Sequence, residues 1–182
     1  VPSFSFIATA NAPLFVGAKP VFAEIEKGTY GLDPADVEKK ITKKTKAIIP
    51  VHYGGGSCKI GELKKIAKKH NLFVLEDAAQ SVGAELDRQR VGSLGDAASF
   101  SLHPLKNLHA FGDGGITTAN DINLIKNLNI RKNHGLSNRD RCEFWSFNSR
   151  LDELQASLLR IQLVELPRWT EERRQLALRY HK

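Results

Sequence analysis

The chain has 182 residues, of which 41% are hydrophobic, so it can bury a core and is most simply interpreted as one main globular domain. No apolar run is long enough to cross a bilayer and no basic leader precedes one, so we expect neither a membrane span nor a signal peptide. The formal charge is +7, but the lysines lie on the polar face of apolar helical patterns and no nucleic-acid-binding motif is present. We therefore expect no nucleic-acid partner.

Five short segments, rich in apolar and β-branched residues and bounded by turn residues, predict strands. In chain order they are residues 19–25, 46–52, 72–77, 97–102 and 114–119.

Three amphipathic patterns between these segments predict helices at Asp33–Ile41, Ile60–His70 and Asp121–Lys132. The first begins with Asp33 in the capping position and Pro34 in the first helical position. Alternating strands and helices are typical of a mostly parallel sheet with helices on both faces, so we predict a three-layer α/β/α fold.

The last part of the chain has one long helical pattern, which we expect to be interrupted at Pro167. We expect residues 1–149 to form the core of the α/β domain and residues 150–182 to lead toward a further domain. The chain has no methionine and begins within strand or loop material, so we interpret it as an interior piece of a longer protein.

Polar residues follow three of the predicted strands. In an open α/β sheet, ligands bind outside the carboxyl ends of the strands, so these residues are the candidates for a site. They are His52, Asp77, Gln80, Ser101 and Lys106. Lys106 differs from the other lysines because leucines, alanine and phenylalanine surround it, which is compatible with a packed surface position or with chemistry.

Each of these features also has a simple structural explanation. Residues 54–56 are three glycines, but they match neither the P-loop nor the dinucleotide fingerprint, which favours a plain turn. Asp77 by itself is explained best as a helix cap. The histidines lack metal-ligand spacing, so we expect no metal site. Cys58 and Cys142 form no paired motif, which fits a reducing cytoplasm.

Taken together, a strand-end aspartate, a glutamine three residues later and an isolated lysine are what pyridoxal phosphate chemistry requires. The lysine can form a Schiff base with the cofactor aldehyde and then move a proton. The aspartate can pair with the pyridine nitrogen, so that the protonated ring stabilises a carbanion.

The segments EDAAQSVGA, SFSLHPLKNLHAFGDGGITT, RKNHG and RLDELQASLLRIQL closely resemble the DegT/StrS family of sugar aminotransferases, which are pyridoxal-phosphate enzymes of fold type I. The resemblance implies that Lys106 is the Schiff-base lysine and that Asp77 is the partner of the pyridine nitrogen. It also implies that Gln80 lies beside the ring, that Ser101 binds the phosphate, and that Asn148 reaches the cofactor phosphate of the neighbouring subunit in a homodimer.

By the same resemblance, the reaction moves an amino group from an amino acid, glutamate, to a nucleotide-linked keto sugar. Family members usually carry an aromatic residue where this chain has Ser149. Some relatives have histidine in place of the lysine and dehydrate sugars, whereas Lys106 here favours amino transfer. A regulatory or sensor protein that binds the cofactor without turnover, a sugar dehydratase relative, and a binding module with a buried lysine are the alternatives.

Overall fold

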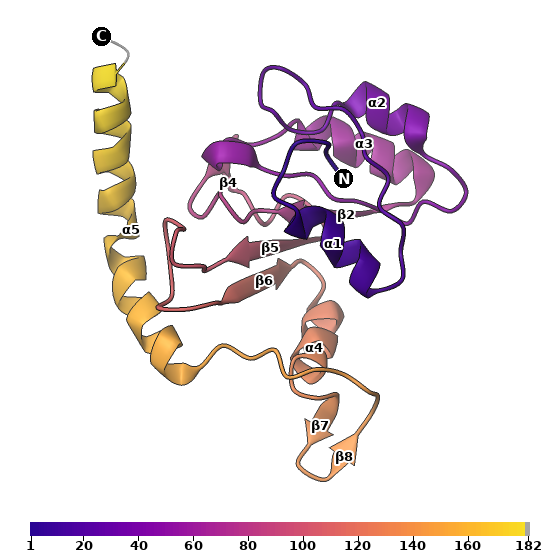
Figure 1. Cartoon of the computed structure of the whole chain (residues 1–182), viewed down its shortest axis with the longest axis vertical. Coiled ribbons are helices and arrows are strands. Elements are labelled where there is room, and N and C mark those ends of the chain that lie inside the picture. The colour runs from indigo at the N-terminus through magenta and orange to yellow at the C-terminus, as the bar shows by residue number, and fades with distance from the viewer. Residues whose placement is uncertain (181–182) are drawn as a thin grey trace.

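The structure, a computed structural model, describes residues 1–180 (Figure 1). Its central sheet has four strands. The strands are β1 (Ala47–Ile48), β2 (Phe73–Asp77), β5 (Ala97–Ser101) and β6 (Gly115–Ala119), and they lie in the order β1-β2-β5-β6. The first three are parallel, and β6 is antiparallel to β5. The prediction of an α/β fold with a mostly parallel sheet is confirmed.

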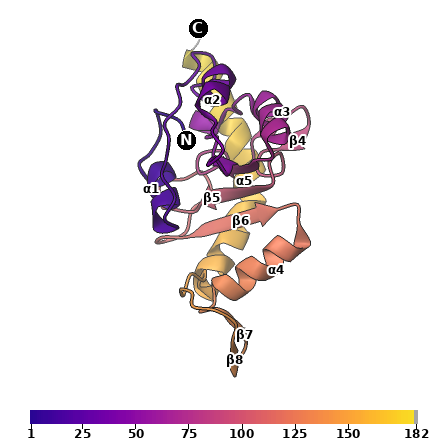
Figure 2. The same cartoon turned by 90° about the vertical axis from the view of Figure 1, so that its right-hand side faces the viewer.

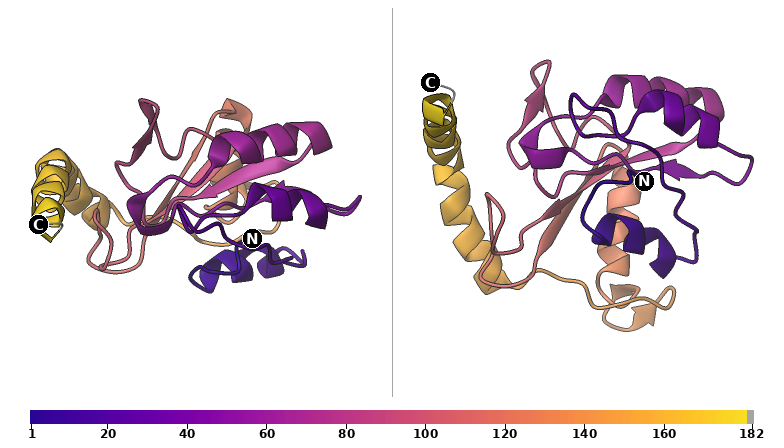
Figure 3. Two further views of the ribbon diagram at one scale, coloured as in Figure 1. Left: turned by 90° about the horizontal axis from the view of Figure 1, so that it is seen from above. Right: turned by 45° about the horizontal axis from the view of Figure 1, so that its top comes forward.

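Helices lie on both sides of these strands. They are α1 (Ala8–Phe15), α2 (Pro34–Lys40), the short η1 (Tyr53–Gly55), α3 (Ile60–His70), α4 (Ile122–Arg131) and α5 (Glu153–Tyr180). In Figures 2 and 3, α1 lies on one side of the strands, while α3 and α4 lie on the other. Two small hairpins complete the chain: β3–β4 (Glu85–Leu86 and Gln89–Arg90) and β7–β8 (Leu136–Asn138 and Arg141–Cys142).

The helix signals in the sequence act as predicted. The Asp33 carboxylate accepts a hydrogen bond from the Ala35 amide at 2.9 Å, and Pro34 occupies the first turn of α2. Asp121 caps α4 in the same way, through the amide of Asn123 at 2.8 Å. These caps satisfy amide groups that have no partner within the helix, so each helix begins where its cap residue stands.

The larger hydrophobic core lies between the sheet and the layer of α2 and α3. It includes Leu32, Val37, Ile48, Leu63 and Val74, all of which are buried. A smaller cluster joins α5 to the segment after β5 and consists of Leu102, Leu108, Ala110 and Leu159. The long helix is therefore anchored to the segment that carries Lys106.

Two strand predictions need correction. Residues 19–25 form no continuous strand, because only isolated bridges at Ala23 and Ile25 are made. The bridge partner of Ala23 is Pro2, which lacks the N–H that a longer ladder needs. Residues 46–52 contain only the two-residue strand β1, and a separate bridge forms at Val51. Pro50 lies between these two pairings and cannot donate to the ladder.

The predicted interruption at Pro167 is wrong, because α5 continues through this residue to Tyr180. A proline removes one helical hydrogen bond, and neighbouring contacts stabilise the helix here. Leu166 is buried, and Arg168 forms ion pairs with Glu165 at 2.8 Å and Glu172 at 3.1 Å. Within residues 1–180, no helix combines the length and apolar character needed to span a membrane.

Candidate functional site

The carboxyl ends of β2 and β5 meet at one edge of the sheet because these two strands are parallel neighbours. Asp77 pairs with Ser99, and paired residues in neighbouring strands point to the same face. Ser101 lies two residues beyond Ser99 and therefore shares this face. The hydroxyl of Thr9 on α1 contacts Asp77, so this is the side of the sheet on which α1 lies.

Two neutral donors hold the Asp77 carboxylate. The Thr9 hydroxyl, on a residue that is only 6% exposed, donates at 2.6 Å, and the Ala79 amide donates at 3.1 Å. Asp77 therefore caps a turn, whereas the sequence had suggested a helix cap. Within residues 1–180 no lysine, arginine or histidine forms an ion pair with Asp77. The Asp77 carboxylate therefore has no direct contact with a cationic side chain among the described residues.

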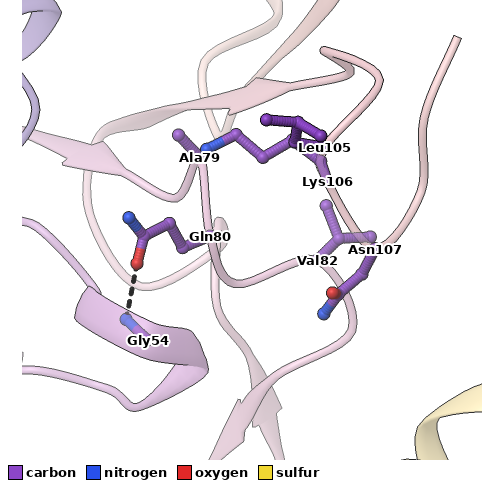
Figure 4. Close-up of a pocket in the computed structure, with 7 residues that line it drawn as sticks. All are labelled: Gly54, Ala79, Gln80, Val82, Leu105, Lys106 and Asn107. Carbon is purple, nitrogen blue, oxygen red and sulfur yellow. Dashed lines mark hydrogen bonds between the residues drawn. The ribbon is translucent and has the colours of Figure 1, made fainter.

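Lys106 and Gln80 line one pocket of about 300 Å³ (Figure 4). The other lining residues are Gly54, Ala79, Val82, Leu105 and Asn107. In this view the Lys106 side chain extends toward Ala79, the residue whose amide contacts Asp77. The Lys106 amine makes no ion pair with any of the residues that the structure describes.

Gln80 is oriented by the glycine turn. Its side-chain oxygen accepts a hydrogen bond from the Gly54 amide at 2.7 Å. Gly54 and Gly55 have φ values of 61° and 87°, in the left-handed region that glycine adopts most easily. The three glycines therefore form a turn, as predicted, and this turn also fixes a side chain of the pocket.

Ser101 begins the turn that carries Lys106. Its hydroxyl accepts a hydrogen bond from the His103 amide at 3.3 Å, and the His103 carbonyl accepts one from the Lys106 amide at 2.9 Å. Ser101 is not among the residues that line the pocket. The structure thus places Asp77, Gln80, Ser101 and Lys106 on two adjacent strand ends and the turns that follow them.

Asn148 lies elsewhere in the chain. It bridges Asn133, just after α4, and its side-chain oxygen accepts a hydrogen bond from Arg150 at 2.9 Å. It is exposed and does not line the pocket. Within one copy of residues 1–180, Asn148 does not join the other candidates.

A buried hydrogen bond between a histidine and a carboxylate, which sequence reasoning missed, lies on the opposite face of β2. Glu76 and His52 are both 0% exposed, with 2.9 Å between the carboxylate and Nε2. The Cys58 amide donates to Nδ1 of His52, so Nε2 carries the proton that is donated to Glu76. His52 is therefore a structural residue, and residues 1–180 contain no cluster of three metal-binding side chains.

Three backbone amides complete the surroundings of Glu76: those of Gly92, Leu94 and Gly95, at 2.9, 2.8 and 2.6 Å. Burial raises the pKa of Glu76, but the hydrogen bonds from His52 and from the Gly95 and Gly92 amides outweigh it and hold the pKa below its ordinary value. The sequence gives one sign of this buried site: Glu76 is a second carboxylate next to Asp77 in a predicted strand. Because neighbouring residues of a strand point to opposite faces, the two carboxylates must have different surroundings.

The comparisons with known proteins identify the relatives of this chain. The model of the DegT/DnrJ/EryC1/StrS aminotransferase family matches residues 1–182. A dTDP-3-amino-3,6-dideoxy-alpha-D-galactopyranose transaminase of Aneurinibacillus thermoaerophilus is 48% identical over 99% of this chain and 50% of its own length. A pleiotropic regulatory protein of Geobacillus stearothermophilus is 46% identical over 98% of this chain and 48% of its own length.

Solved structures give the same result. DesV of S. venezuelae superposes with a TM-score of 0.96 at 41% identity, over 99% of this chain and 48% of that protein. The putative sugar aminotransferase Spr1654 of Streptococcus pneumoniae, in its PMP form, gives a TM-score of 0.91 at 26% identity, over 98% of this chain and 53% of that protein. The chain thus spans about half the length of the relatives that it matches.

Proposed function

Because the chain belongs to the DegT/DnrJ/EryC1/StrS aminotransferase family, which depends on pyridoxal 5'-phosphate, we propose that its protein is a sugar aminotransferase. The amino donor is an amino acid, glutamate, and the acceptor is a nucleotide-linked keto sugar. Relatives named as transaminases of dTDP-linked amino sugars support this acceptor. The observation that carries the proposal is the Lys106 amine, which has no ion pair within residues 1–180 and lies in one pocket with Gln80.

The residues present fit the cofactor. Lys106 offers a primary amine for its aldehyde, and Asp77 offers a carboxylate held only by neutral donors for its protonated ring nitrogen. Gln80 would lie beside the ring, and Ser101 would bind the phosphate. When bound, the cofactor supplies an electron sink for the carbon that carries the transferred nitrogen.

The side chains of this chain have separate tasks in that reaction. Lys106 would carry a proton between the substrate carbon and the cofactor carbon, first as a general base and then as a general acid. Asp77 would pair with the ring nitrogen of the cofactor, and the Thr9 hydroxyl and the Ala79 amide hold its carboxylate in position. Gln80 is held against the pocket wall by Gly54.

We further propose that the protein is a homodimer and that each subunit has two domains. Asn148 would serve the cofactor phosphate of the neighbouring subunit in a homodimer, because it lies away from the pocket of its own chain. Residues 1–149 would form the core of the cofactor domain, and residues 150–182 would lead to a smaller domain. We place the reaction in the cytoplasm, which is compatible with the two free cysteines, Cys58 and Cys142.

Lys106 can be tested directly in the full-length protein. Borohydride reduction followed by peptide mapping should place a pyridoxyl group on Lys106. Lys106→Ala should abolish transamination and leave the cofactor loosely bound, because the covalent attachment and the proton carrier are both lost. Lys126→Ala is the matched control, since Lys126 is exposed on α4, and it should behave as wild type. A pyridoxyl group on another lysine would contradict the assignment.

A regulatory function is the second candidate, because one relative is named as a pleiotropic regulatory protein and another as the sensory transduction protein EryC1. Such a protein would bind the cofactor without turnover. An assay with glutamate and a nucleotide-linked keto sugar separates the two: an aminated sugar product supports the enzyme. Cofactor binding without any product supports the regulator, and loss of a sugar hydroxyl without amination supports a dehydratase.

A further inference from the structure

We propose that Gln155 and Gln162 on α5 are positioning residues that hold the turn carrying Lys106. The inference rests on the proposed role of Lys106, but the contacts that support it belong to this chain alone. Neither glutamine lines the pocket, so both would act through the backbone of the turn.

The turn itself is closed by backbone hydrogen bonds. The Ala110 amide donates to the Leu102 carbonyl at 2.7 Å, which brings the two ends of the segment together. Within it, the Lys106 amide donates to His103 at 2.9 Å, and the Lys106 carbonyl lies 3.1 Å from Nδ1 of His109. The backbone on both sides of Lys106 is therefore tied to other residues of the turn.

Two side chains of helix α5 accept hydrogen bonds from the backbone that follows Lys106. The side-chain oxygen of Gln155 accepts a hydrogen bond from the Phe111 amide at 2.8 Å, and that of Gln162 accepts one from the His109 amide at 3.2 Å. The two glutamines are seven residues apart, which is about two helical turns and places them on one face of the helix. In Figure 1, α5 runs beside the loop that joins β5 to β6.

Leu159 lies between the two glutamines on the same face of α5. It is buried and packs in one cluster with Leu102, Leu108 and Ala110. An apolar side chain at the centre therefore supplies the packing, and the glutamines on either side supply acceptors for two backbone amides. The position of the Lys106 amine depends on this arrangement, and a shift of about 1 Å in a catalytic group can cost roughly a hundredfold in rate.

The variants are chosen to remove the amide group while keeping the length of the side chain. Gln155→Met and Gln162→Met, singly and together, keep the length of the side chain but lose its amide oxygen. Gln155→Glu and Gln162→Glu keep an oxygen that can accept the same bond. Gln175→Met is the control, because Gln175 lies on the same helix and, among the described residues, its side chain forms a hydrogen bond only with Glu171, at 2.7 Å.

The first measurements use the full-length protein without cofactor. Hydrogen exchange at the His109 and Phe111 amides should become faster in the Met variants, by roughly fivefold for each lost hydrogen bond, with exchange in β2 unchanged. The rate at which acetic anhydride modifies Lys106, relative to Lys126, should also change. The Glu variants and Gln175→Met should match wild type in both measurements.

The last measurement is the steady-state kinetics of the full-length protein with its cofactor bound. In the double Met variant, kcat should fall by roughly tenfold or more while KM changes little, and the Glu variants should restore it. Unchanged exchange and unchanged Lys106 modification in the double variant would overturn the inference, as would equal effects in Gln175→Met. If the double variant fails to fold, the same measurements on the single Met variants and their Glu counterparts test the inference. Absence of amino transfer in wild type would contradict the proposed function, whereas the cofactor-free measurements would still test the contacts.

Discussion

Glu76 and Asp77 are adjacent carboxylates in opposite environments, because neighbouring residues of a strand point to opposite faces. Glu76 is fully buried, and His52 and three backbone amides contact it. Asp77 accepts two hydrogen bonds from neutral groups and has no ion pair within residues 1–180. The first carboxylate is satisfied by the fold, whereas the second can take a cationic ligand.

We predict that Glu76→Gln destabilises the fold by about 3 kcal/mol at pH 7, because the new amide nitrogen cannot accept the hydrogen bonds that one carboxylate oxygen takes from His52 and Gly92, and two buried donors lose their acceptor. The folded pKa of Glu76 lies below the ordinary value of 4.5, so the ionised form stabilises the fold. This contribution is complete above that pH and is lost as the pH falls through the folded pKa.

Urea unfolding of wild type and Glu76→Gln between pH 3 and pH 7 tests this prediction, with the range chosen to span roughly the ordinary carboxylate pKa. Wild type should lose more stability than the variant as the pH falls. Asp152→Asn is a suitable control, because Asp152 is exposed and forms no ion pair within the described residues. Parallel curves for wild type and Glu76→Gln would show that Glu76 is not ionised in the fold.

At the scale of elements, the segment between β4 and β5 wraps around Glu76 and depends on its glycines. Gly92 has a φ of +94°, and a Cβ at this position would overlap the ring of Phe100 in β5. Its amide also donates to Glu76. A side chain here would therefore meet strain in the backbone and a clash in the core.

We predict that Gly92→Ala destabilises the protein by about 3 kcal/mol or more, through backbone strain and overpacking together. Gly17→Ala is the matched control, because Gly17 has a φ of +72° but a Cβ added there would meet no atom within 4 Å. It should cost only about 1–2 kcal/mol, the strain alone. Chemical denaturation of both variants measures the difference, and equal losses would rule out a clash at Phe100.

At the scale of the whole molecule, two aromatic side chains close to Asn148 in the sequence are exposed. Trp145 is 98% exposed and Phe147 is 82% exposed, although large aromatic side chains are normally buried at least in part. Exposed apolar patches of this kind mark interaction surfaces, which supports the proposed contact with a second subunit.

A composite site predicts complementation between two inactive variants of the full-length protein. In a mixed dimer of Lys106→Ala and Asn148→Ala chains, one site carries both defects and the other carries none. Half of the randomly formed dimers are mixed and each of these has one intact site of two, so activity should recover to roughly a quarter of wild type. The measurement is transaminase activity after the two chains are unfolded and refolded together, with each variant refolded alone as the control. Activity equal only to the average of the two parents would place Asn148 in the site of its own chain or outside it.

Much of the fold could be predicted because its signals are local. The Asp33 and Pro34 pair set the start of α2, the spacing of Ile60 and Leu63 set the buried face of α3, and short apolar runs marked β2, β5 and β6. The same local signals picked out Asp77, Gln80 and Lys106 as polar residues that follow strands. Local patterns failed at Pro167, where packing of Leu166 and ion pairs of Arg168 keep the helix continuous.

The sequence by itself therefore determined α2, α3, α4, β2, β5 and β6, the α/β class and the residue types at the strand ends, but not α1, the two hairpins or the continuity of α5. Only the tertiary structure decided which distant groups meet. His52 and Glu76 are 24 residues apart and Thr9 and Asp77 are 68 apart, so no local pattern could connect them. The antiparallel direction of β6 and the contact of Gln155 with the turn of Lys106 depend likewise on chain topology. The physical reason is that periodicity and capping act over a few residues, whereas pairing across the sheet is set by how the whole chain buries its apolar surface.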